Sequence, residues 1–184
     1  MDLKPDKCDM VADLTSADSL RLAFNQLHRE HGDKIAAVIH LAAYFDFTGV
    51  KSVLYEEVNV EGTRRLLDAL EPFDVERFIY SGTMLVHKPV SPGEYVTEGS
   101  PLAPGWAYPE SKAETEAVIQ QYGERIPYTL LHLAGLYDEN TAVPTLSHQI
   151  ARIYERAMES HLYSGNLDAG QAFIHLEDML EVFK

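Results

Sequence analysis

A tyrosine and a lysine that could transfer protons lie four residues apart in the segment YPESK, at Tyr108 and Lys112. Four positions make about one helical turn, so the two side chains point the same way on a helix. A free tyrosine has a pKa of about 10, and a nearby ammonium favours the phenolate. The pair could therefore work as a tuned acid/base. A solvated tyrosine–lysine pair has the same spacing, so its context must decide.

Short apolar segments alternate with longer amphipathic segments along the chain. Thr15 or Ser16 can cap the first predicted helix, and Gly32 ends it. The predicted strands cover 8–13, 34–43, 76–84, 126–137 and 170–175, and the predicted helices cover 14–32, 53–71, 107–123, 143–161 and 176–184. This alternation predicts an α/β fold with a doubly wound parallel sheet and right-handed crossovers.

Ligands of such sheets gather at the carboxyl ends of the strands. That rule selects three strand ends as the expected site, at residues 40–43, 81–84 and 132–135. Tyr108 begins the helix that follows the second of them, after a loop rich in proline and glycine. The chemistry-bearing pair is therefore expected beside the sheet's carboxyl edge.

Seven segments, in order, resemble the patterns of the NAD-dependent epimerase/dehydratase family, which is also called the extended short-chain dehydrogenases/reductases. The segments are VADLTS, VIHLAA, NVEGT, FIYSGTMLVH, YPESK, LLHLAGLYD and AFIHLEDM. The Tyr/Lys spacing alone has little weight, but the ordered set along almost the whole chain is specific. The resemblance implies a Rossmann-like fold and NAD or NADP as cofactor.

The resemblance assigns catalytic roles to three residues. Tyr108 would be the acid/base, and Lys112 would lower the pKa of its phenol and hold the nicotinamide ribose. Thr83 stands where the family places a hydroxyl that orients the substrate oxygen. Ser81 is the alternative hydroxyl on the same strand, and Thr83 could instead be a simple strand-end cap.

The resemblance also implies residues that contact the cofactor and the substrate. Asp13 and Leu14 stand where the family contacts adenine, and Asn59 where it bonds backbone near the active site. The expected cofactor-binding residues are Asp13, Leu14, Leu41, Ala42, Ala43, Asn59, Ser81, Tyr108, Lys112, His132 and Ala134. The expected substrate contacts are Tyr44, Thr83 and Met84. We expect no metal, because no Asp/Glu/Cys cluster joins the His28/His31 pair and a solvated helix face explains it.

The residues after Thr83 bear on the type of reaction. The family's dehydratases usually carry acidic residues there, whereas this chain has Met84 and Leu85. We therefore favour an oxidoreductase or epimerase. The substrate would be a small molecule, either a sugar nucleotide or a less polar carbonyl or carbinol compound, which the apolar segment 44–50 would suit. The alternative is a non-catalytic relative that acts as a binding or regulatory module.

The family's glycine-rich phosphate-binding turn has no counterpart, because no glycine precedes Gly32. We expect that unit upstream of residue 1. Residues 1–141 would then be a partial NAD(P)-binding domain, truncated at the N-terminus, and 142–184 the beginning of a substrate-binding lobe. The apolar strand at 34–43 would form a raw sheet edge. We also expect residues 1–14 to be disordered or misplaced and dinucleotide binding by this chain to be weak.

The formal charge of −14 and the pI of about 4.8 argue against nucleic acid and anionic membranes as partners. No apolar run approaches the roughly 20 residues of a spanning helix. A single cysteine fits a reducing, cytoplasmic setting. Family members often pair through the helices at 52–70 and 107–122, so a homodimer is expected there. Its candidate apolar face is Leu66, Leu67, Leu70, Val118 and Ile119, which could instead pack on the chain's own sheet.

Overall fold

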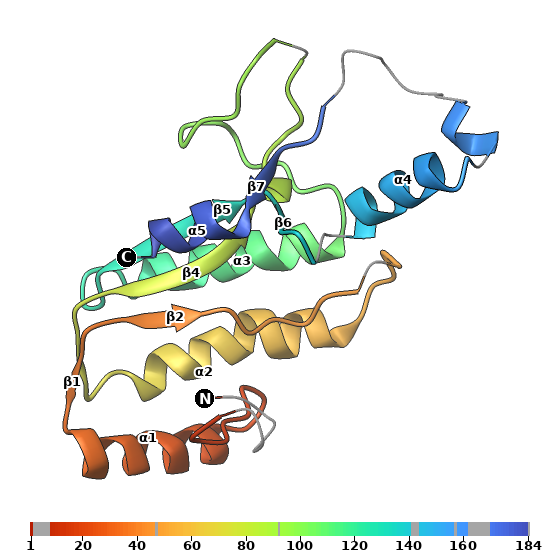
Figure 1. Cartoon of the computed structure of the whole chain (residues 1–184). Helices are drawn as coiled ribbons and strands as arrows, with labels where there is room; N and C mark the ends of the chain where they lie inside the picture. Colours follow the sequence, from red (N-terminus) through yellow and green to blue (C-terminus); the bar gives the residue numbers. More distant parts are fainter. Residues whose placement is uncertain are drawn as a thin grey trace. The chain divides into compact units, whose positions relative to one another are not determined.

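The computed structural model describes residues 1, 8–46, 48–91, 93–140, 144–156, 158–161 and 170–183. The chain forms two compact units, one of residues 1–88 and 101–132 and one of residues 89–100 and 133–184. Parallel strands joined through helices give a Rossmann-like α/β fold, which confirms the predicted class (Figure 1). The predicted domain boundary after residue 141 stays a prediction.

The predicted strand at 34–43 forms as two short pieces, β1 (Lys34–Ile35) and β2 (Val38–His40). The predicted strand at 76–84 forms as β4 (Phe78–Thr83), and a short strand that was not predicted, β3 (Asp74–Val75), precedes it. Their parallel register runs from Lys34↔Asp74 to His40↔Tyr80, a constant offset of 40 residues (74 − 34 and 80 − 40). Hydrogen bonds from Glu76 N to Ile35 O and from Val38 N to Arg77 O, both 2.9 Å, carry the pairing across the break. With β5 (Tyr128–Leu133), the sheet order is β2-β4-β5.

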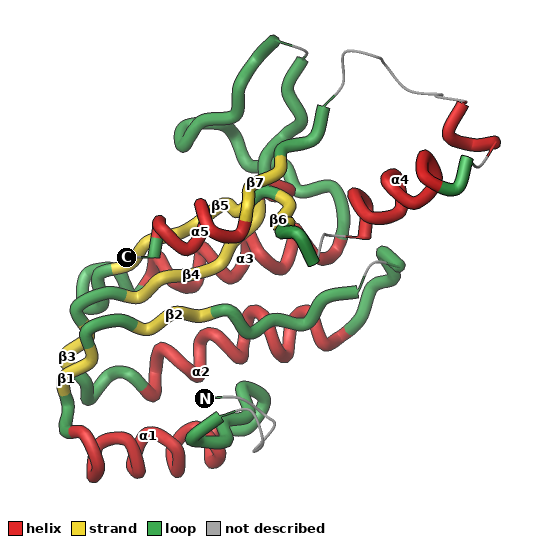
Figure 2. The backbone as a smooth tube through the Cα atoms, viewed as in Figure 1, coloured by secondary structure: helices red, strands yellow, loops and turns green. Residues whose placement is uncertain are grey.

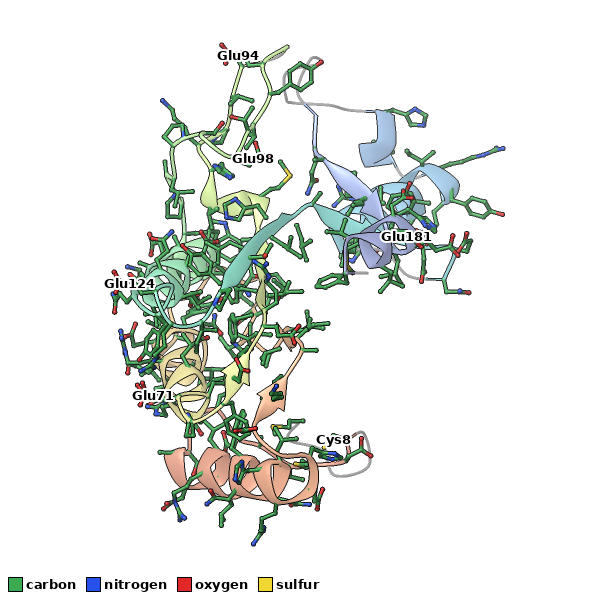
Figure 3. All side chains as sticks on the ribbon, turned by 90° about the vertical axis from the view of Figure 1, so that its left-hand side faces the viewer. Cys8, Glu71, Glu94, Glu98, Glu124 and Glu181 are labelled. Atoms are coloured by element: carbon green, nitrogen blue, oxygen red, sulfur yellow. The ribbon has the colours of Figure 1, made fainter. Side chains whose placement is uncertain are left out.

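Three α-helices of the first unit lie on one side of β2 and β4 (Figures 1 and 3). They are α1 (Ala17–His31), α2 (Glu61–Ala69) and α3 (Ala107–Gln121). Ser16 caps α1 by accepting from Ser19 N, and Gly32 ends it with a φ of 84°, so both predicted ends are confirmed. Glu71 and Glu124, which follow α2 and α3, lie on the helical side of this unit (Figure 3).

The hydrophobic core lies between these helices and the sheet. Phe78 and Tyr80 of β4 are fully buried in it, together with side chains from α1, α2 and α3. The expected dimer face is wrong in its residues, because Leu66, Leu67, Leu70, Val118 and Ile119 are all buried in this core. Each fully buried leucine stabilises the fold by about 1.5–3 kcal/mol, which explains why these side chains face inward.

The predicted helix at 53–71 contains a π-helical turn, η1 (Tyr55–Val60), before α2 begins. Gly62 follows it and lets the chain entering α1 approach closely. A Cβ at Gly62 would lie 3.0 Å from Leu14 Cβ and 3.4 Å from Glu57 O. The glycine inside this helix is therefore a packing requirement.

The predicted strand at 8–13 is wrong, because only Val11 has bridge geometry there. The chain turns instead: Asp13 Oδ1 accepts from Thr15 N at 2.8 Å, and Asp13 O accepts from Ser16 N at 3.1 Å. Ala12 and Leu14 pack against the core. Residues 2–7 of the segment expected to be disordered lie outside the described residues.

Among its described residues, the second unit has two paired strands and two α-helices, which Figure 2 colours yellow and red. β6 (Gly135–Tyr137) runs parallel to β7 (Phe173–His175), so the predicted strand at 126–137 is broken at Ala134 between β5 and β6. The helices are α4 (Pro144–Tyr154) and α5 (Leu176–Val182), with a 3-10 turn η3 (Met158–His161). None of the described helices has the length and apolar character needed to cross a membrane.

Candidate active site

Lys112 and Tyr108 lie on the first turns of α3, beside the carboxyl end of β4. Lys112 is only 2% exposed, and its Nζ donates to Ser81 O at 2.8 Å. The same Nζ lies 4.6 Å from the ring centroid of Tyr80 and 5.8 Å from that of Tyr108. The structure therefore brings together Ser81, Tyr108 and Lys112, and it excludes a solvated Tyr/Lys pair.

The ammonium of Lys112 is held in an unfavourable environment. Burial lowers its pKa to about 8, and the carboxylate of Glu116 opposes that lowering. Burying a charged group costs free energy, so buried charged residues are rare in proteins and cluster at functional sites. This burial marks the start of α3 as a candidate active site.

Tyr108 differs from the expectation in its acidity. Burial raises the pKa of the half-buried phenol, and Tyr55 adds to that increase. The expected lowering of this pKa by Lys112 is wrong here, because the amine is turned to Ser81 O and lies 5.8 Å from the Tyr108 ring centroid. Tyr108 therefore keeps its proton at neutral pH and can act as an acid.

The two candidate hydroxyls at the end of β4 have different roles. Thr83, 8% exposed, accepts a hydrogen bond from Leu85 N at 3.3 Å and caps the 3-10 turn η2 (Met84–Val86). That bond uses an oxygen lone pair and does not consume the hydroxyl hydrogen. Ser81 Oγ instead donates its hydrogen to His40 O at 3.0 Å. Thr83 is thus both a strand-end cap and the better hydroxyl to donate to a substrate oxygen.

Asn59 connects the carboxyl end of β2 to α3. Its Oδ1 accepts from Tyr44 N at 2.7 Å, and its Nδ2 donates to Tyr44 O at 3.1 Å and to Ser111 Oγ at 2.9 Å. Ser111 Oγ donates in turn to Tyr108 O at 2.8 Å. The expected bonding of Asn59 to backbone is therefore present, and it fixes residue 44 relative to the turn that carries Tyr108.

His40 is a neutral ring that supports the Asn59 network through Thr63. Burial lowers its pKa to about 3, with Lys112 as the second cause. Thr63 Oγ1 donates its single hydrogen to Asn59 O at 2.6 Å, so it must accept from His40 Nε2, 2.8 Å away. The hydrogen-bond pattern thus assigns the Nε2–H tautomer to His40.

Aromatic rings surround Tyr108. Phe45 packs edge-on against it with ring centroids 4.4 Å apart, and Trp106 lies 5.6 Å away. Tyr44, the expected substrate contact, packs instead against Tyr55 at 5.0 Å. Phe45 is 40% exposed and is the ring of this loop that faces Tyr108 and the solvent. Sequence reasoning missed Phe45, because the sequence does not show whether Tyr44 or Phe45 turns towards Tyr108. The hydrogen bonds of Asn59 to the backbone of Tyr44 fix that choice.

The other expected contact residues are spread over both units. Asp13 and Leu14 lie at the start of α1, where Asp13 accepts from Thr15 and Leu14 packs over Gly62. Leu41 and Ala42 are exposed at the end of β2, next to the half-buried Ala43, and Met84 opens η2. His132 Nδ1 lies 2.7 Å from His87 Nε2, its Nε2 lies 3.1 Å from Glu116 Oε1, and Ala134 belongs to the second unit. Their contacts with a cofactor or substrate stay predictions.

Sequence reasoning also missed three polar residues that face inward on α3 beside Lys112. Ser111, Thr115 and Glu116 are buried, as Lys112 is, and the four residues form two i,i+4 pairs. That spacing was the available signal, because buried polar residues at helical spacing in a core-facing stripe break the usual pattern.

The site has the chemistry that a nicotinamide cofactor requires. Lys112 Nζ has three hydrogens, one of which goes to Ser81 O, so it can donate others to ribose hydroxyls. Exposed Leu41 and Ala42 at the carboxyl end of β2 leave the main chain open to a flat ligand. Among the described residues, no group of three metal-ligating side chains could hold a metal ion.

Comparisons with known proteins agree with this geometry. The family model for the NAD dependent epimerase/dehydratase family matches residues 6–184. The dTDP-D-glucose 4,6-dehydratase of Mus musculus is 28% identical over 155 residues, which cover 82% of this chain and 43% of that protein. The chain thus spans less than half the length of the curated relatives that it matches.

Solved structures show the same fold. The UDP-glucose 4-epimerase of Thermus thermophilus in complex with NAD gives a TM-score of 0.73 at 22% identity, covering 94% of this chain and 57% of that one. The dTDP-glucose 4,6-dehydratase DesIV from Streptomyces venezuelae, with NAD and TYD bound, gives 0.67 at 22% identity, covering 94% and 52%. From the family match over residues 6–184, the chain belongs to the NAD dependent epimerase/dehydratase family.

Proposed function

We propose that this chain carries the acid/base centre of an NAD(P)-dependent oxidoreductase or epimerase that transfers hydride at a carbinol or carbonyl carbon. The observation that best supports this proposal is the burial of Lys112, whose exposed fraction is 2%. Lys112 lies one helical turn from Tyr108 and donates a hydrogen bond to Ser81 O at the carboxyl end of β4. The structural relatives crystallised with NAD support the choice of cofactor. The proposal covers NAD and NADP alike.

Each residue has a defined task in this proposal. A bound nicotinamide cofactor supplies or accepts the hydride. Tyr108, protonated at neutral pH, donates its phenolic proton to the substrate oxygen when a carbonyl is reduced and takes it back in the reverse direction. The Thr83 hydroxyl donates a hydrogen bond that orients the same oxygen. Lys112 holds ribose hydroxyls and favours the phenolate that forms during turnover.

The substrate class is a small molecule with an oxidisable carbon, either a sugar nucleotide or a less polar carbonyl compound. A similar solved structure in complex with NAD and UDP and the curated dTDP-D-glucose 4,6-dehydratases support the first option, and Phe45 beside Tyr108 supports an apolar substrate face. Met84 and Leu85 offer no proton-transferring group after Thr83, so we favour hydride transfer without dehydration. A homodimer through helices 52–70 and 107–122 would have to use side chains other than the five that are buried in the core.

The test is a hydride-transfer assay of the full-length protein with NAD or NADP and a panel of sugar nucleotides and carbonyl compounds. Tyr108→Phe should lower the rate at least about 100-fold, which is the usual contribution of a general acid/base. The matched control is Tyr55→Phe, a buried tyrosine whose ring centroid lies 6.4 Å from that of Tyr108. Equal rates for wild type and Tyr108→Phe would overturn the proposal.

A second candidate function is a non-catalytic binding module, and one observation favours it. The raised pKa of Tyr108 means that the chain alone does not prepare a phenolate. A protein of this kind would bind the dinucleotide and catalyse no hydride transfer with any substrate of the panel. Product analysis in the same assay also identifies dehydration, through the loss of one water from the substrate.

A further inference from the structure

Three polar side chains outside the acid/base centre form a chain in which Glu116 and His87 are buried and the His132 side chain is 24% exposed. Glu116 Oε1 of α3 lies 3.1 Å from His132 Nε2 of β5, and His132 Nδ1 lies 2.7 Å from His87 Nε2, just after η2. Glu116 is 2% exposed and His87 is 6% exposed. The three residues come from separate parts of the first unit, and none of them has a task in the mechanism above.

The distances favour one arrangement of hydrogens in this chain. His132 Nε2 lies 3.1 Å from Glu116 Oε1, which favours a hydrogen on that nitrogen and leaves the Nδ1 lone pair of a neutral ring for His87 Nε2, 2.7 Å away. Within the described residues, Glu116 Oε1, His132 Nε2 and His87 Nδ1 are buried without a hydrogen bond of good geometry. His132 thus lies against the carboxylate without a hydrogen bond that would use its charge.

Strand β4 is built around that carboxylate. A Cβ at Gly82 would lie 2.9 Å from Glu116 Oε1 and 2.9 Å from Leu131 O, so only glycine fits. Gly82 stands between Ser81, whose carbonyl holds Lys112 Nζ, and Thr83. A buried ion pair is weak evidence for stability, since apolar side chains fill such space at least as well. A task connected with the site explains the arrangement better.

Lys112 is the group on which Glu116 can act, because it precedes Glu116 by one turn on the same helix and is buried to the same 2%. The titratable groups around the carboxylate are Lys112 from α3, Tyr80 from β4, His132 from β5 and His87 from the segment after η2. We propose that Glu116, oriented by His132 and His87, is a positioning residue that stabilises the ammonium form of Lys112 inside the protein. This inference rests on the function proposed for Lys112.

The first test is a pH titration of the Lys112 side chain by NMR, using 13C-labelled lysine and assigning the signal by its loss in Lys112→Met. Glu116→Gln should lower the pKa of Lys112 by about one unit, a tenfold larger acid dissociation constant. The matched control is Glu114→Gln, an exposed carboxylate on the same helix. Equal small shifts in both variants would overturn the proposal. The readout needs no turnover, so its failure is distinguishable from failure of the proposed function.

A second measurement on the wild-type chain keeps the proposal testable if Glu116→Gln does not fold. Nitrogen-15 NMR reports which ring nitrogen of each histidine carries hydrogen. We expect Nε2–H on both His132 and His87 near neutral pH, and the Nδ1–H tautomer on His132 would overturn the proposal. In the active full-length enzyme, Glu116→Gln should shift the pH profile of hydride transfer to higher pH, in the same direction as Lys112→Met, because less of the Lys112 amine then carries a charge. KM should change less than twofold.

Discussion

At the scale of single residues, the buried amine of Lys112 dominates the candidate site. Its pKa is about 8 in the folded chain and 10.5 in an unfolded one, so the unfolded state binds more protons between these values. A difference of about 2.5 units corresponds to about 3 kcal/mol of destabilisation, which is fully present below pH 8 and is lost as pH rises towards 10.5. The buried amine of Lys112 therefore lowers the free energy of unfolding of the chain below pH 8.

Lys112→Met should therefore stabilise the chain relative to wild type, and the advantage should depend on pH. The free energy of unfolding of the variant minus that of wild type should fall by about 2–3 kcal/mol between pH 7 and pH 10. Loss of the bond to Ser81 O reduces the absolute gain, because that carbonyl loses its partner. Urea unfolding at several pH values measures this difference. Lys34→Met, at an exposed lysine, is the control, and an equally flat difference for both variants would contradict the account.

Sequence predicted the residues of the site better than their protonation. Tyr108 and Lys112 lie four residues apart, so a single helix brings them to the same side. Because ligands of parallel sheets gather at the carboxyl ends of the strands, that helix is expected beside Ser81 and Thr83. The direction of the pKa shift at Tyr108 could not be predicted, because it depends on how far the ring is buried and on where the amine points. Both are set by side chains distant in sequence, such as Phe45 and Tyr55.

At the scale of elements, η1 determines the shape of the segment that follows β2. Asn59 and Tyr55 both lie in this π-helical turn, and both bond the backbone of that segment: Asn59 at Tyr44 and Tyr55 at Asp46 O. π-helical turns recur at functional sites because they redirect side chains within a helix. Here the turn connects the carboxyl end of β2 to α3 through Ser111.

Asn59→Ala should destabilise the chain by at least about 2 kcal/mol, since it leaves both backbone groups of Tyr44 and one side-chain oxygen without their partner. Asn25→Ala, at an exposed position of α1, should change stability by less than about 0.5 kcal/mol. Chemical unfolding of both variants provides the comparison. A double-mutant cycle with Ser111→Ala should show coupling of at least about 0.5 kcal/mol. An Asn59→Ala variant as stable as Asn25→Ala would show that the network has no structural weight.

The elements themselves were largely predictable, and their interruptions were not. The caps Ser16 and Gly32 delimit α1 as expected, because capping is local chemistry. The apolar pattern of the π-helical turn is the same as that of an α-helix, so the pattern does not reveal the turn. The turn accompanies the hydrogen bonds of Asn59 to the backbone of Tyr44, which is distant in sequence. The turn at Asp13 replaces a predicted strand because its carboxylate bonds Thr15 locally, where the apolar pattern of residues 8–13 indicated pairing.

At the scale of the whole molecule, the first unit has an apolar strand at the edge of its described three-stranded sheet. β2 is that edge, and Ile39 on it is 48% exposed, with Leu41 at 63% just beyond. Ile39 pairs in register with Ile79 on β4. Exposed apolar edges promote association with other chains. This agrees with the edge that the sequence predicted at residues 34–43.

The isolated chain should therefore associate as its concentration rises, and Ile39→Lys should reduce the association without lowering stability by more than about 0.5 kcal/mol. Light scattering after size exclusion gives the molar mass at each concentration. Leu22→Lys, at a 61% exposed leucine on α1, is the matched control and should leave the association unchanged. A constant monomeric mass, or the same effect from both lysine variants, would contradict this view of the sheet edge.

The order of strands and helices was accessible from the sequence, because parallel sheets allow few arrangements and direct ligands to one edge. The contact of Glu116 with His132 and His87 was not. It joins three segments distant in the chain, and each residue by itself resembles an ordinary surface group. Only the packing of α3 against β4 and β5 reveals that the three side chains lie together, with Glu116 and His87 buried.

The central claim is that the phenol of Tyr108 exchanges the proton of the reacting oxygen and that Lys112 stabilises the phenolate that forms during turnover. The most direct test is the single-turnover rate of hydride transfer against pH in the full-length enzyme. We predict that the wild-type rate of substrate oxidation rises with pH along one ionisation, which moves to higher pH in Lys112→Met and disappears in Tyr108→Phe. A Tyr108→Phe enzyme with the wild-type rate and pH profile would contradict the account.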